Sequence, residues 1–258
     1  GDCRYGRNII EPDKGGIVGY ALFKLYEATG EKRFLRQAVR NADLLAKNMR
    51  PADTSRSPWP FRVDSITGAY WAERSGNMAY ILRLFDALLE KGYGKYRTPR
   101  EQLWTWIRDC LLRTPDDPSR CLWVQFFEDY DVHDNRNSWA PLEMARYLIE
   151  RREALDPDWK AHAEQLIQFA LRYFSNTQPG GVTRMGEQDT DVKAWGGACS
   201  KLGGVTALFY AAGGGEPYKE MAFRNLNWMT YFIDDDGCPA QRADADNTDR
   251  GGWQEDCH

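Results

Sequence analysis

The sequence predicts an all-α fold in which antiparallel helical hairpins curl into a ring, an α/α toroid. Two observations support this prediction. Apolar residues recur every three or four positions in segment after segment, which is the spacing of amphipathic helices. These segments come in pairs, and the pairs repeat at a step of about 60 residues, which is typical of a repeat architecture. The whole chain, residues 1–258, is expected to form one such domain.

Four helical hairpins are expected. Their first helices should begin near Gly16, Ser75, Ser138 and Ser200. Their second helices should cover residues 31–49, 98–113, 156–175 and 216–234. Thr98 and Asp156, each followed by proline, are expected N-caps, and Glu101 would complete a capping box with Thr98. The breaks within the pairs are short, so the two helices of each pair should pack antiparallel.

Four long connections follow the second helices, at residues 50–74, 114–137, 176–199 and 236–258. Because each one follows the second helix of a hairpin, all four should emerge at the same end of the ring. Long loops in a compact domain usually carry function. We therefore expect these four loops to wall a pocket.

Composition and charge exclude several classes of protein. The chain has 34 basic and 38 acidic side chains, a formal net charge of −4, and its basic residues are scattered. A nucleic-acid partner is not expected, because it needs a concentrated basic face. Nor is a membrane partner, because no apolar stretch approaches the roughly 20 residues that cross a bilayer. The N-terminus has no apolar signal region, but a processed precursor would look the same, so this absence does not decide the location. The location is left unknown, with a periplasmic or secreted one slightly favoured over the cytoplasm.

The hairpins resemble those of a known group of proteins. The segments GIVGYALFKLYEATGEKRFLRQAVRNADLLAKNM and SGNMAYILRLFDALLEKG, joined by SPWPFRVDSITGAYW, are similar to the (α/α) toroids of the six-hairpin glycosidase-like superfamily. The resemblance implies a ring-shaped fold and an oligo- or polysaccharide substrate. It carries over no catalytic residue, because no single family's motif is matched. Such toroids usually have five to seven hairpins and four are visible here, so a homo-oligomer that completes or covers the ring stays open.

The loops contain side chains that suit a polar, ring-shaped ligand. Indole rings stack on pyranose faces, carboxylates hold hydroxyl groups, and arginine can grip a uronate carboxylate with two hydrogen bonds. Trp59, Trp139 and Trp253 are expected stacking platforms, and Arg62, Arg136 and Arg184 are expected to hold an anionic group. The full set of expected substrate-binding residues is Trp59, Arg62, Asp64, Arg136, Asn137, Trp139, Arg184, Trp195 and Trp253. The alternative is that acidic loops are merely solvated and tryptophans plug the ends of the ring.

Hydrolysis of a glycosidic bond needs two carboxyl groups, one protonated and one ionised. Two loops supply alternating acids. We expect Asp129 or Asp131 to pair with Glu187 or Asp191 across the pocket. The sequence therefore favours a glycoside hydrolase that acts on an acidic, uronate-containing glycan, without a metal ion or another cofactor.

Two alternatives stay open. A polysaccharide lyase would neutralise a uronate and remove its C5 proton with a histidine or tyrosine. His133 and Tyr130 lie in one loop beside Arg136 and Asn137, which is the composition that elimination requires. The second alternative is a non-catalytic helical-repeat module whose loops bind a glycan or a protein.

Overall fold

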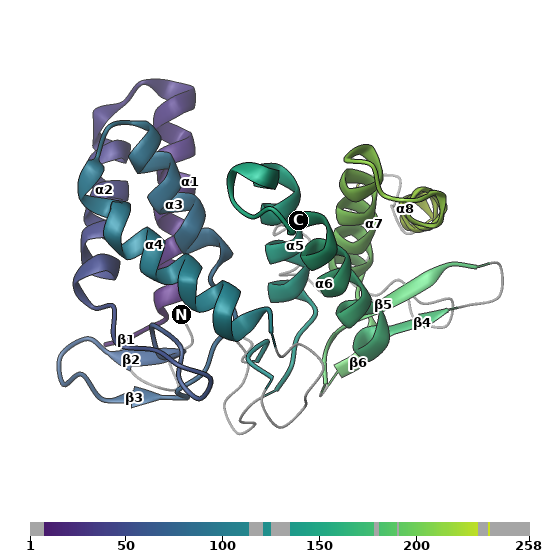
Figure 1. The fold of residues 1–258 in the computed structure, drawn as a ribbon, viewed down its shortest axis with the longest axis horizontal. Helices are drawn as coiled ribbons and strands as arrows, with labels where there is room; N and C mark the ends of the chain where they lie inside the picture. The colour runs from purple at the N-terminus through teal and green to yellow at the C-terminus, as the bar shows by residue number, and fades with distance from the viewer. Residues whose placement is uncertain are drawn as a thin grey trace. The chain divides into compact units, whose positions relative to one another are not determined.

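The computed structural model describes residues 8–113, 121–124, 135–177, 181–189, 191–231 and 237, with the backbone alone for 191–193. This part of the chain is dominated by eight α-helices, which confirms the predicted all-α class (Figure 1). The helices group into two compact units, residues 1–134 and 135–258. Each unit holds two of the four expected hairpins. None of the described helices is both long enough and apolar enough to span a bilayer.

The first unit contains α1 (Pro12–Thr29), α2 (Lys32–Lys47), α3 (Ala79–Glu90) and α4 (Arg97–Trp106), which a π-helical turn at Ile107–Leu111 extends. The second contains α5 (Trp139–Arg151), α6 (Trp159–Phe174), α7 (Gly196–Ala211) and α8 (Glu216–Thr230). Short 3-10 turns at Gly94–Tyr96 and Arg152–Ala154 precede α4 and follow α5. The helices of each expected pair are in contact, and so are the first helices of adjacent pairs, α1 with α3 and α5 with α7.

Several predicted helix starts need correction. Asp156 is not the N-cap of α6, which begins at Trp159 after Asp158. Helices α3 and α7 begin at Ala79 and Gly196 rather than near Ser75 and Ser200. Helix α1 begins at Pro12 rather than near Gly16, because proline suits the first helical position. The predicted N-cap at Thr98 and its capping box with Glu101 are wrong, because α4 begins at Arg97. The preceding turn ends at Tyr96, a buried residue whose hydroxyl donates to Asp43 Oδ1 at 2.8 Å, so the chain is already anchored before Thr98.

Among the described residues two small antiparallel sheets lie mainly in the connections 50–74 and 176–199, and the sequence analysis missed both. The first has the order β1 (Ile9–Ile10), β2 (Arg62–Asp64), β3 (Tyr70–Trp71). The second has the order β4 (Ser175–Thr177), β5 (Thr183–Gln188), β6 (Asp191–Ala194). Strands this short do not produce a readable alternation of apolar and polar residues.

Each sheet lies at the end of its unit where a first helix begins and a second helix ends. In the first unit β1 directly precedes α1 and pairs with β2, which follows α2 (Figure 1). In the second unit β4 follows α6 directly and β6 leads into α7. The connections 50–74 and 176–199 therefore begin where α2 and α6 end, as expected for loops that follow the second helix of a hairpin.

Glycines allow α1 to approach α3 closely. A Cβ atom at Gly16 would lie 2.7 Å from Ile81 Cγ1 and 2.9 Å from the backbone nitrogen of Ile81. A Cβ atom at Gly19 would lie 2.6 Å from Leu84 Cδ2. Ile81 and Leu84 are fully buried, so there is no free space into which they could move. The contact between the first two hairpins therefore depends on the absence of side chains on this side of α1.

Replacing Gly16 by alanine should lower the free energy of unfolding by about 1–3 kcal/mol, because the added methyl group meets backbone atoms of α3. The matched control is Gly15→Ala, whose Cβ would make an ordinary 3.8 Å contact with Leu45. This control should be neutral or more stable by up to about 1 kcal/mol, since alanine is the better helix former. Urea denaturation of both variants measures the difference. Equal stability of the two variants would show that the α1–α3 contact is not close-packed.

Candidate functional site

A cavity of about 1330 Å³ opens in the first unit. The sheet β1–β2–β3 forms one wall, and the start of α1 with the end of α2 forms the other. Its polar lining includes Glu11, Lys14, Arg50, Arg62, Asp64 and Tyr70. Three of the residues predicted from the sequence to bind substrate, Trp59, Arg62 and Asp64, therefore line one cavity together with Glu11, a carboxyl group that was not predicted.

Glu11 and Arg62 form a largely buried ion pair on this cavity. Glu11 is the N-cap residue of α1, and its Oε1 accepts a hydrogen bond from Arg62 Nε at 2.7 Å. The Arg62 guanidinium also lies 4.6 Å from the ring centre of Phe61. Burial raises the pKa of the Glu11 carboxyl, and the nearby charge of Asp13 raises it further, although Arg62 opposes both effects. Glu11 thus keeps its proton at a higher pH than an ordinary glutamate.

The pKa of Asp64, which lines the same cavity, shifts in the opposite direction. Its Oδ1 accepts hydrogen bonds from the backbone N–H groups of Thr67 at 2.9 Å and Ile66 at 2.8 Å. These backbone donors lower the pKa of Asp64, so its carboxylate stays ionised. One cavity therefore carries two carboxyl groups whose surroundings push their pKa values apart, the condition that separates an acid from a base.

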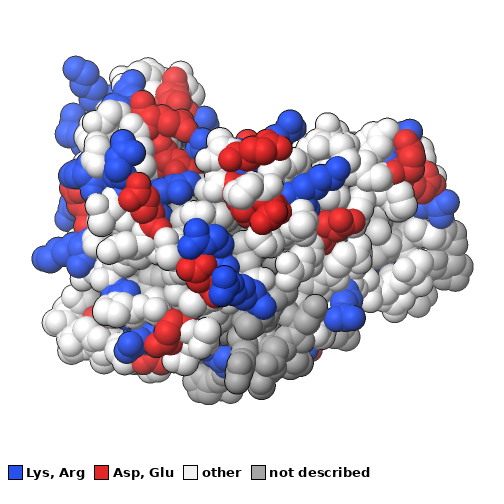
Figure 2. Space-filling model, viewed as in Figure 1, with Lys and Arg blue, Asp and Glu red and all other residues white. Residues whose placement is uncertain are grey.

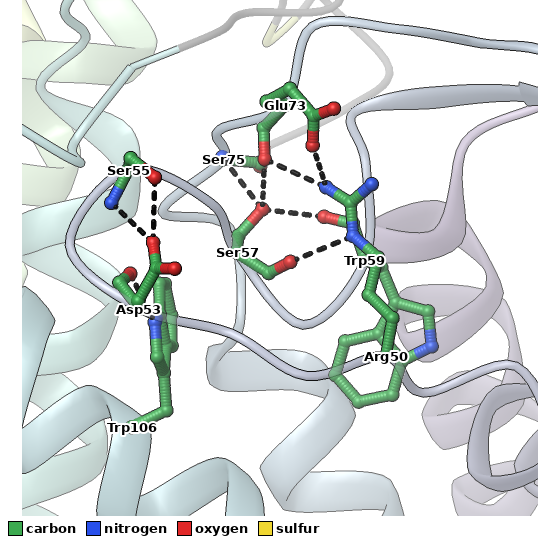
Figure 3. Close-up of polar contacts among 8 residues, drawn as sticks. All are labelled: Arg50, Asp53, Ser55, Ser57, Trp59, Glu73, Ser75 and Trp106. Atoms are coloured by element: carbon green, nitrogen blue, oxygen red, sulfur yellow. Dashed lines mark hydrogen bonds and ion pairs between the residues drawn. The ribbon is translucent and has the colours of Figure 1, made fainter.

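Arg50 fastens the connection that carries this wall of the cavity (Figure 3). Its Nε donates to the carbonyl oxygen of Ser57 at 3.0 Å, and its Nη2 donates to the carbonyl oxygen of Glu73 at 2.9 Å. The Glu73 carboxylate lies 2.9 Å from the same Nη2. The Ser57 hydroxyl joins the network through the carbonyl oxygens of Trp59 and Glu73 and accepts from the backbone N–H of Ser75. One guanidinium thus ties the two ends of the loop together.

The aromatic side chains of this loop are arranged differently from the prediction. Trp59, a predicted stacking platform, is only 2% exposed and donates its indole N–H to the carbonyl oxygen of Leu45 at 3.0 Å. It is a structural wall residue, because a buried indole has no open face for a sugar ring. Tyr70 on β3 is 48% exposed, lines the cavity, and has the Arg50 guanidinium 5.0 Å from its ring centre. Tyr70 is therefore the aromatic residue of this cavity that could stack on a ligand.

In the second unit, the predicted anion-binding residue Arg136 serves its own loop. Its Nε and Nη2 donate to the two carboxylate oxygens of Asp189 at 2.9 and 3.1 Å, and its guanidinium lies 4.2 Å from the ring centre of Tyr173. This bidentate pair joins the segment before α5 to the β5–β6 hairpin. Asn137 has a comparable role, because its Oδ1 accepts the N–H of Ala140 at 2.9 Å at the start of α5.

Trp139 lies under a buried ion pair. Lys201 Nζ is 4.4 Å from the ring centre of Trp139 and 2.8 Å from Glu143 Oε2. This contact ties α5 to α7 and uses the indole face that the prediction assigned to a sugar. Trp195, at the N-cap position of α7, is also largely buried.

Of the four carboxyl groups predicted to be catalytic, Glu187 is the one whose side chain the structure describes. It lies on β5 and is only 2% exposed, and its carbonyl oxygen accepts the N–H of Ser138 at 2.9 Å. Arg184 lies on the same strand, opposite Asn176, and is half-buried. Of the remaining predictions, five residues and one side chain fall outside the described residues: Asp129, Tyr130, Asp131, His133, Trp253 and the side chain of Asp191.

The sequence analysis missed Glu11, Lys14 and Tyr70. A usable signal existed for Glu11, because an acidic residue directly before proline marks the first turn of a helix. No local signal existed for the cavity itself, since β1 and β2 are paired across more than 50 residues of sequence. Within the described part of the chain, no group of three His, Cys, Asp or Glu side chains could hold a metal ion.

Comparison with solved structures identifies the fold. A sugar epimerase from a ruminal bacterium matches with a TM-score of 0.69 and 17% identity over 90% of this chain. The cellobiose 2-epimerase of Spirochaeta thermophila matches with a TM-score of 0.66 and 17% identity over 91%. An unsaturated glucuronyl hydrolase specific for heparin matches with a TM-score of 0.61 and 14% identity over 93%. The chain spans 62% of the length of each of these proteins.

No protein-family profile and no curated protein matches the sequence. The structural matches agree with the resemblance read from the hairpin sequences, and all three are helical toroids. The chain therefore shares the helical-hairpin fold of these solved α/α toroids.

Proposed function

We propose that the protein is a carbohydrate-active enzyme that hydrolyses a glycosidic bond in an acidic saccharide. The observation that carries this proposal is the pair of carboxyl groups on one cavity, Glu11 with a raised pKa and Asp64 with a lowered pKa. The fold supports it, because proteins of this fold include a glucuronyl hydrolase and sugar epimerases.

In this mechanism Glu11 is the general acid. Its proton passes to the glycosidic oxygen as the bond to the sugar C1 breaks, so the leaving group departs as a neutral alcohol. Asp64 is partly exposed and ionised, and it accepts a proton from the water that attacks C1. Arg62 is a positioning residue, because its hydrogen bond fixes the Glu11 carboxyl against the cavity wall.

An acidic substrate suits the other side chains of the cavity. Three cations, Lys14, Arg50 and Arg62, line it together with the carboxyl groups of Glu11 and Asp64. When Glu11 is protonated, the positive charges prevail and favour an anionic ligand. Tyr70 offers an exposed ring on which a pyranose could stack.

Epimerisation of a sugar is the second candidate, favoured by the epimerases among the structural matches. It moves a proton off and back onto a carbon beside a carbonyl group, which also needs an acid and a base. The two reactions are separable by their products. Hydrolysis creates a new reducing end, whereas epimerisation changes the configuration of one carbon without cleaving the chain.

A substrate screen tests these proposals directly. Heparin oligosaccharides and cellobiose would be incubated with the protein while reducing ends, ultraviolet absorbance and the identity of the sugars are followed. New reducing ends without new absorbance support hydrolysis. A rise in absorbance indicates a C4–C5 double bond and would transfer the assignment to elimination by His133 and Tyr130. Retention of saccharide without any turnover would leave only a binding module.

Substituting Glu11 by glutamine should lower kcat by a factor of about 10²–10⁴, because the general acid is lost. Activity of the wild type should fall as the pH rises through the raised pKa of Glu11, and this alkaline limb should disappear in the variant. The matched control is Glu27→Gln, an exposed residue farther along α1. Wild-type kinetics in Glu11→Gln would remove this residue from the mechanism.

Substituting Glu187 by glutamine tests the carboxyl group predicted from the sequence. A catalytic Glu187 should lose at least about 100-fold in kcat without a change in the far-ultraviolet circular dichroism spectrum. Glu150→Gln, on the exposed surface of α5, is the control. If Glu187→Gln is inactive while Glu11→Gln is active, the catalytic carboxyl belongs to the second unit and the first-unit cavity is not the reaction centre.

Substituting Arg62 by methionine should destabilise the fold in a pH-dependent way. At pH 7 the loss in free energy of unfolding should be about 3–5 kcal/mol, because Glu11 is left buried without its partner. Without Arg62 the pKa of Glu11 in the folded variant is raised further, so the native state binds more protons than the unfolded state. The stability of the variant therefore falls as the pH rises above the ordinary glutamate pKa. The loss should therefore be smaller at pH 4. The double variant Arg62→Met, Glu11→Gln should lack this dependence, and denaturation across pH measures both.

A further inference from the structure

Exposed aliphatic side chains gather on the cavity that holds Glu11 and Asp64. Ile10 on β1, Val18 on α1 and Leu44 on α2 all line this cavity, and they are 51, 51 and 52% exposed. Single exposed apolar residues are ordinary on a protein surface, whereas several on one concave surface indicate a place where an apolar group binds. The proposed mechanism uses only the polar residues of the cavity and leaves these three unexplained.

The helical wall of the cavity is mostly apolar. On α1, Glu11, Gly15 and Val18 are spaced by four and three residues, so they share one side of the helix. On α2, Leu44 and Leu45 line the same wall. Gly15 lies against the Leu45 side chain, since a Cβ atom at this position would be 3.8 Å from Leu45 Cδ2. An apolar surface therefore continues along the hairpin from the Glu11 carboxyl to Val18.

The polar groups gather on the opposite wall, which the sheet forms. Arg62 and Asp64 on β2 carry charges there, and Tyr70 on β3 adds an exposed ring. Lys14 on α1 also lines the cavity and pairs with Asp13, with 3.6 Å between Nζ and Oδ2. Figure 2 shows acidic and basic side chains interspersed over the face that it draws, without a broad surface of one sign. Recognition of an anionic sugar therefore depends on the sheet wall of the cavity.

The position of Glu11 decides which wall receives which part of a glycoside. A general acid gives its proton to the glycosidic oxygen, so the leaving group lies on the side of the acid. Glu11 is the N-cap residue of α1, where the apolar wall begins. Asp64, the proposed base, and Tyr70, the proposed stacking ring, lie on the sheet. The sugar that is cleaved off therefore belongs to the sheet wall, and the leaving group belongs to the helical wall.

The length of the apolar wall sets the size of the leaving group. Val18 follows Glu11 by seven positions, which is about 10 Å along the helix axis and roughly the length of an extended octyl chain. A second sugar ring on this wall would place hydroxyl groups against Val18 and Leu44. An alkyl or aryl group would instead remove both side chains from water, which is favourable in proportion to the apolar area buried.

We propose that the substrate is a glycoside of a uronic acid whose leaving group is an apolar alcohol or phenol, held against Val18 and Leu44. This inference rests on the proposed function, because it takes Glu11 as the acid that faces the leaving group. Hydrolysis breaks the bond between C1 and the glycosidic oxygen, and that oxygen departs with the Glu11 proton as the apolar alcohol. The attacking water gives its hydroxyl group to C1 and its proton to Asp64. Solvent then returns one proton from Asp64 to Glu11.

Two probes that resist hydrolysis test the apolar subsite without turnover. They are methyl and octyl 1-thioglucuronide, in both anomeric forms and below the micellar concentration of the octyl compound, and titration calorimetry measures each Kd. Each methylene group that leaves water should lower Kd about fourfold, so the octyl probe should bind about 100-fold more tightly even if half of its chain stays in water.

The variant Val18→Thr with Leu44→Gln should reduce this preference for the octyl probe at least about tenfold, because it makes the wall polar without a large change in volume. The matched control is Leu25→Gln. Leu25 is 44% exposed on the same helix as Val18 and is not among the residues that line the cavity. The control should keep the preference of the wild type, and thermal melting shows that both variants are folded.

Equal Kd values of the two probes would overturn this inference, whether or not a glucuronide is cleaved. So would a preference for the octyl probe that the double variant keeps or that the control loses. A wild type that sediments as a dimer, with a double variant that sediments as a monomer, would place a second copy of the chain on Val18 and Leu44 and would also overturn it.

Release of alcohol from methyl and octyl O-glucuronides tests the proposed function separately. The wild type should cleave the octyl compound with the higher kcat/KM. Tight binding of the octyl probe that depends on Val18 and Leu44, without release of octanol, would support the apolar subsite and contradict hydrolysis. Release of alcohol from both compounds at equal kcat/KM, with equal Kd values of the probes, would support hydrolysis and remove the apolar subsite.

Discussion

The structure depends on one constraint: each helical hairpin is apolar on one side and must bury that side against its neighbour. In the first unit this burial brings α1 so close to α3 that a Cβ atom at position 16 or 19 would overlap Ile81 or Leu84. Both positions are glycine, which has no Cβ atom. In the second unit a glycine serves the contact within a hairpin instead, since a Cβ atom at Gly203 of α7 would lie 3.0 Å from Leu226 of α8. Since helices pack at fixed distances, the order of the hairpins also fixes which helix ends lie together.

The candidate site follows from that arrangement. The start of α1 and the end of α2 meet at one end of their hairpin, and there the chain pairs β1 with β2. This pairing brings Arg62 to Glu11, two residues separated by 51 positions in the sequence, and buries their charges together. The proposed chemistry rests on the resulting difference in environment. Glu11 is held by one arginine in a buried setting, whereas Asp64 is held by backbone donors near water.

Many charged and aromatic loop residues turned out to stabilise the loops themselves. Arg136 donates hydrogen bonds to Asp189 and lies against the ring of Tyr173. Trp59 donates to a carbonyl oxygen at the end of α2, and Arg50 donates to carbonyl oxygens of its own loop. The physical reason is general. A long connection has few backbone partners, so its polar groups are satisfied by side chains of the same composition that would suit a sugar. Composition alone therefore cannot separate a residue that holds a ligand from one that holds the loop.

The sequence by itself determined the all-α class, the four hairpins and the approximate bounds of their helices, because the spacing of apolar residues is a local property that burial must respect. It also determined which loops are rich in carboxylates, arginine and tryptophan. Only the tertiary structure decided which of these side chains meet. The partnership of Glu11 with Arg62, the burial of Trp59 and the exposure of Tyr70 all depend on strand pairing between distant segments. Such pairing leaves no periodic trace in strands of two or three residues, and the pKa of a carboxyl group follows from the neighbours that it acquires on folding.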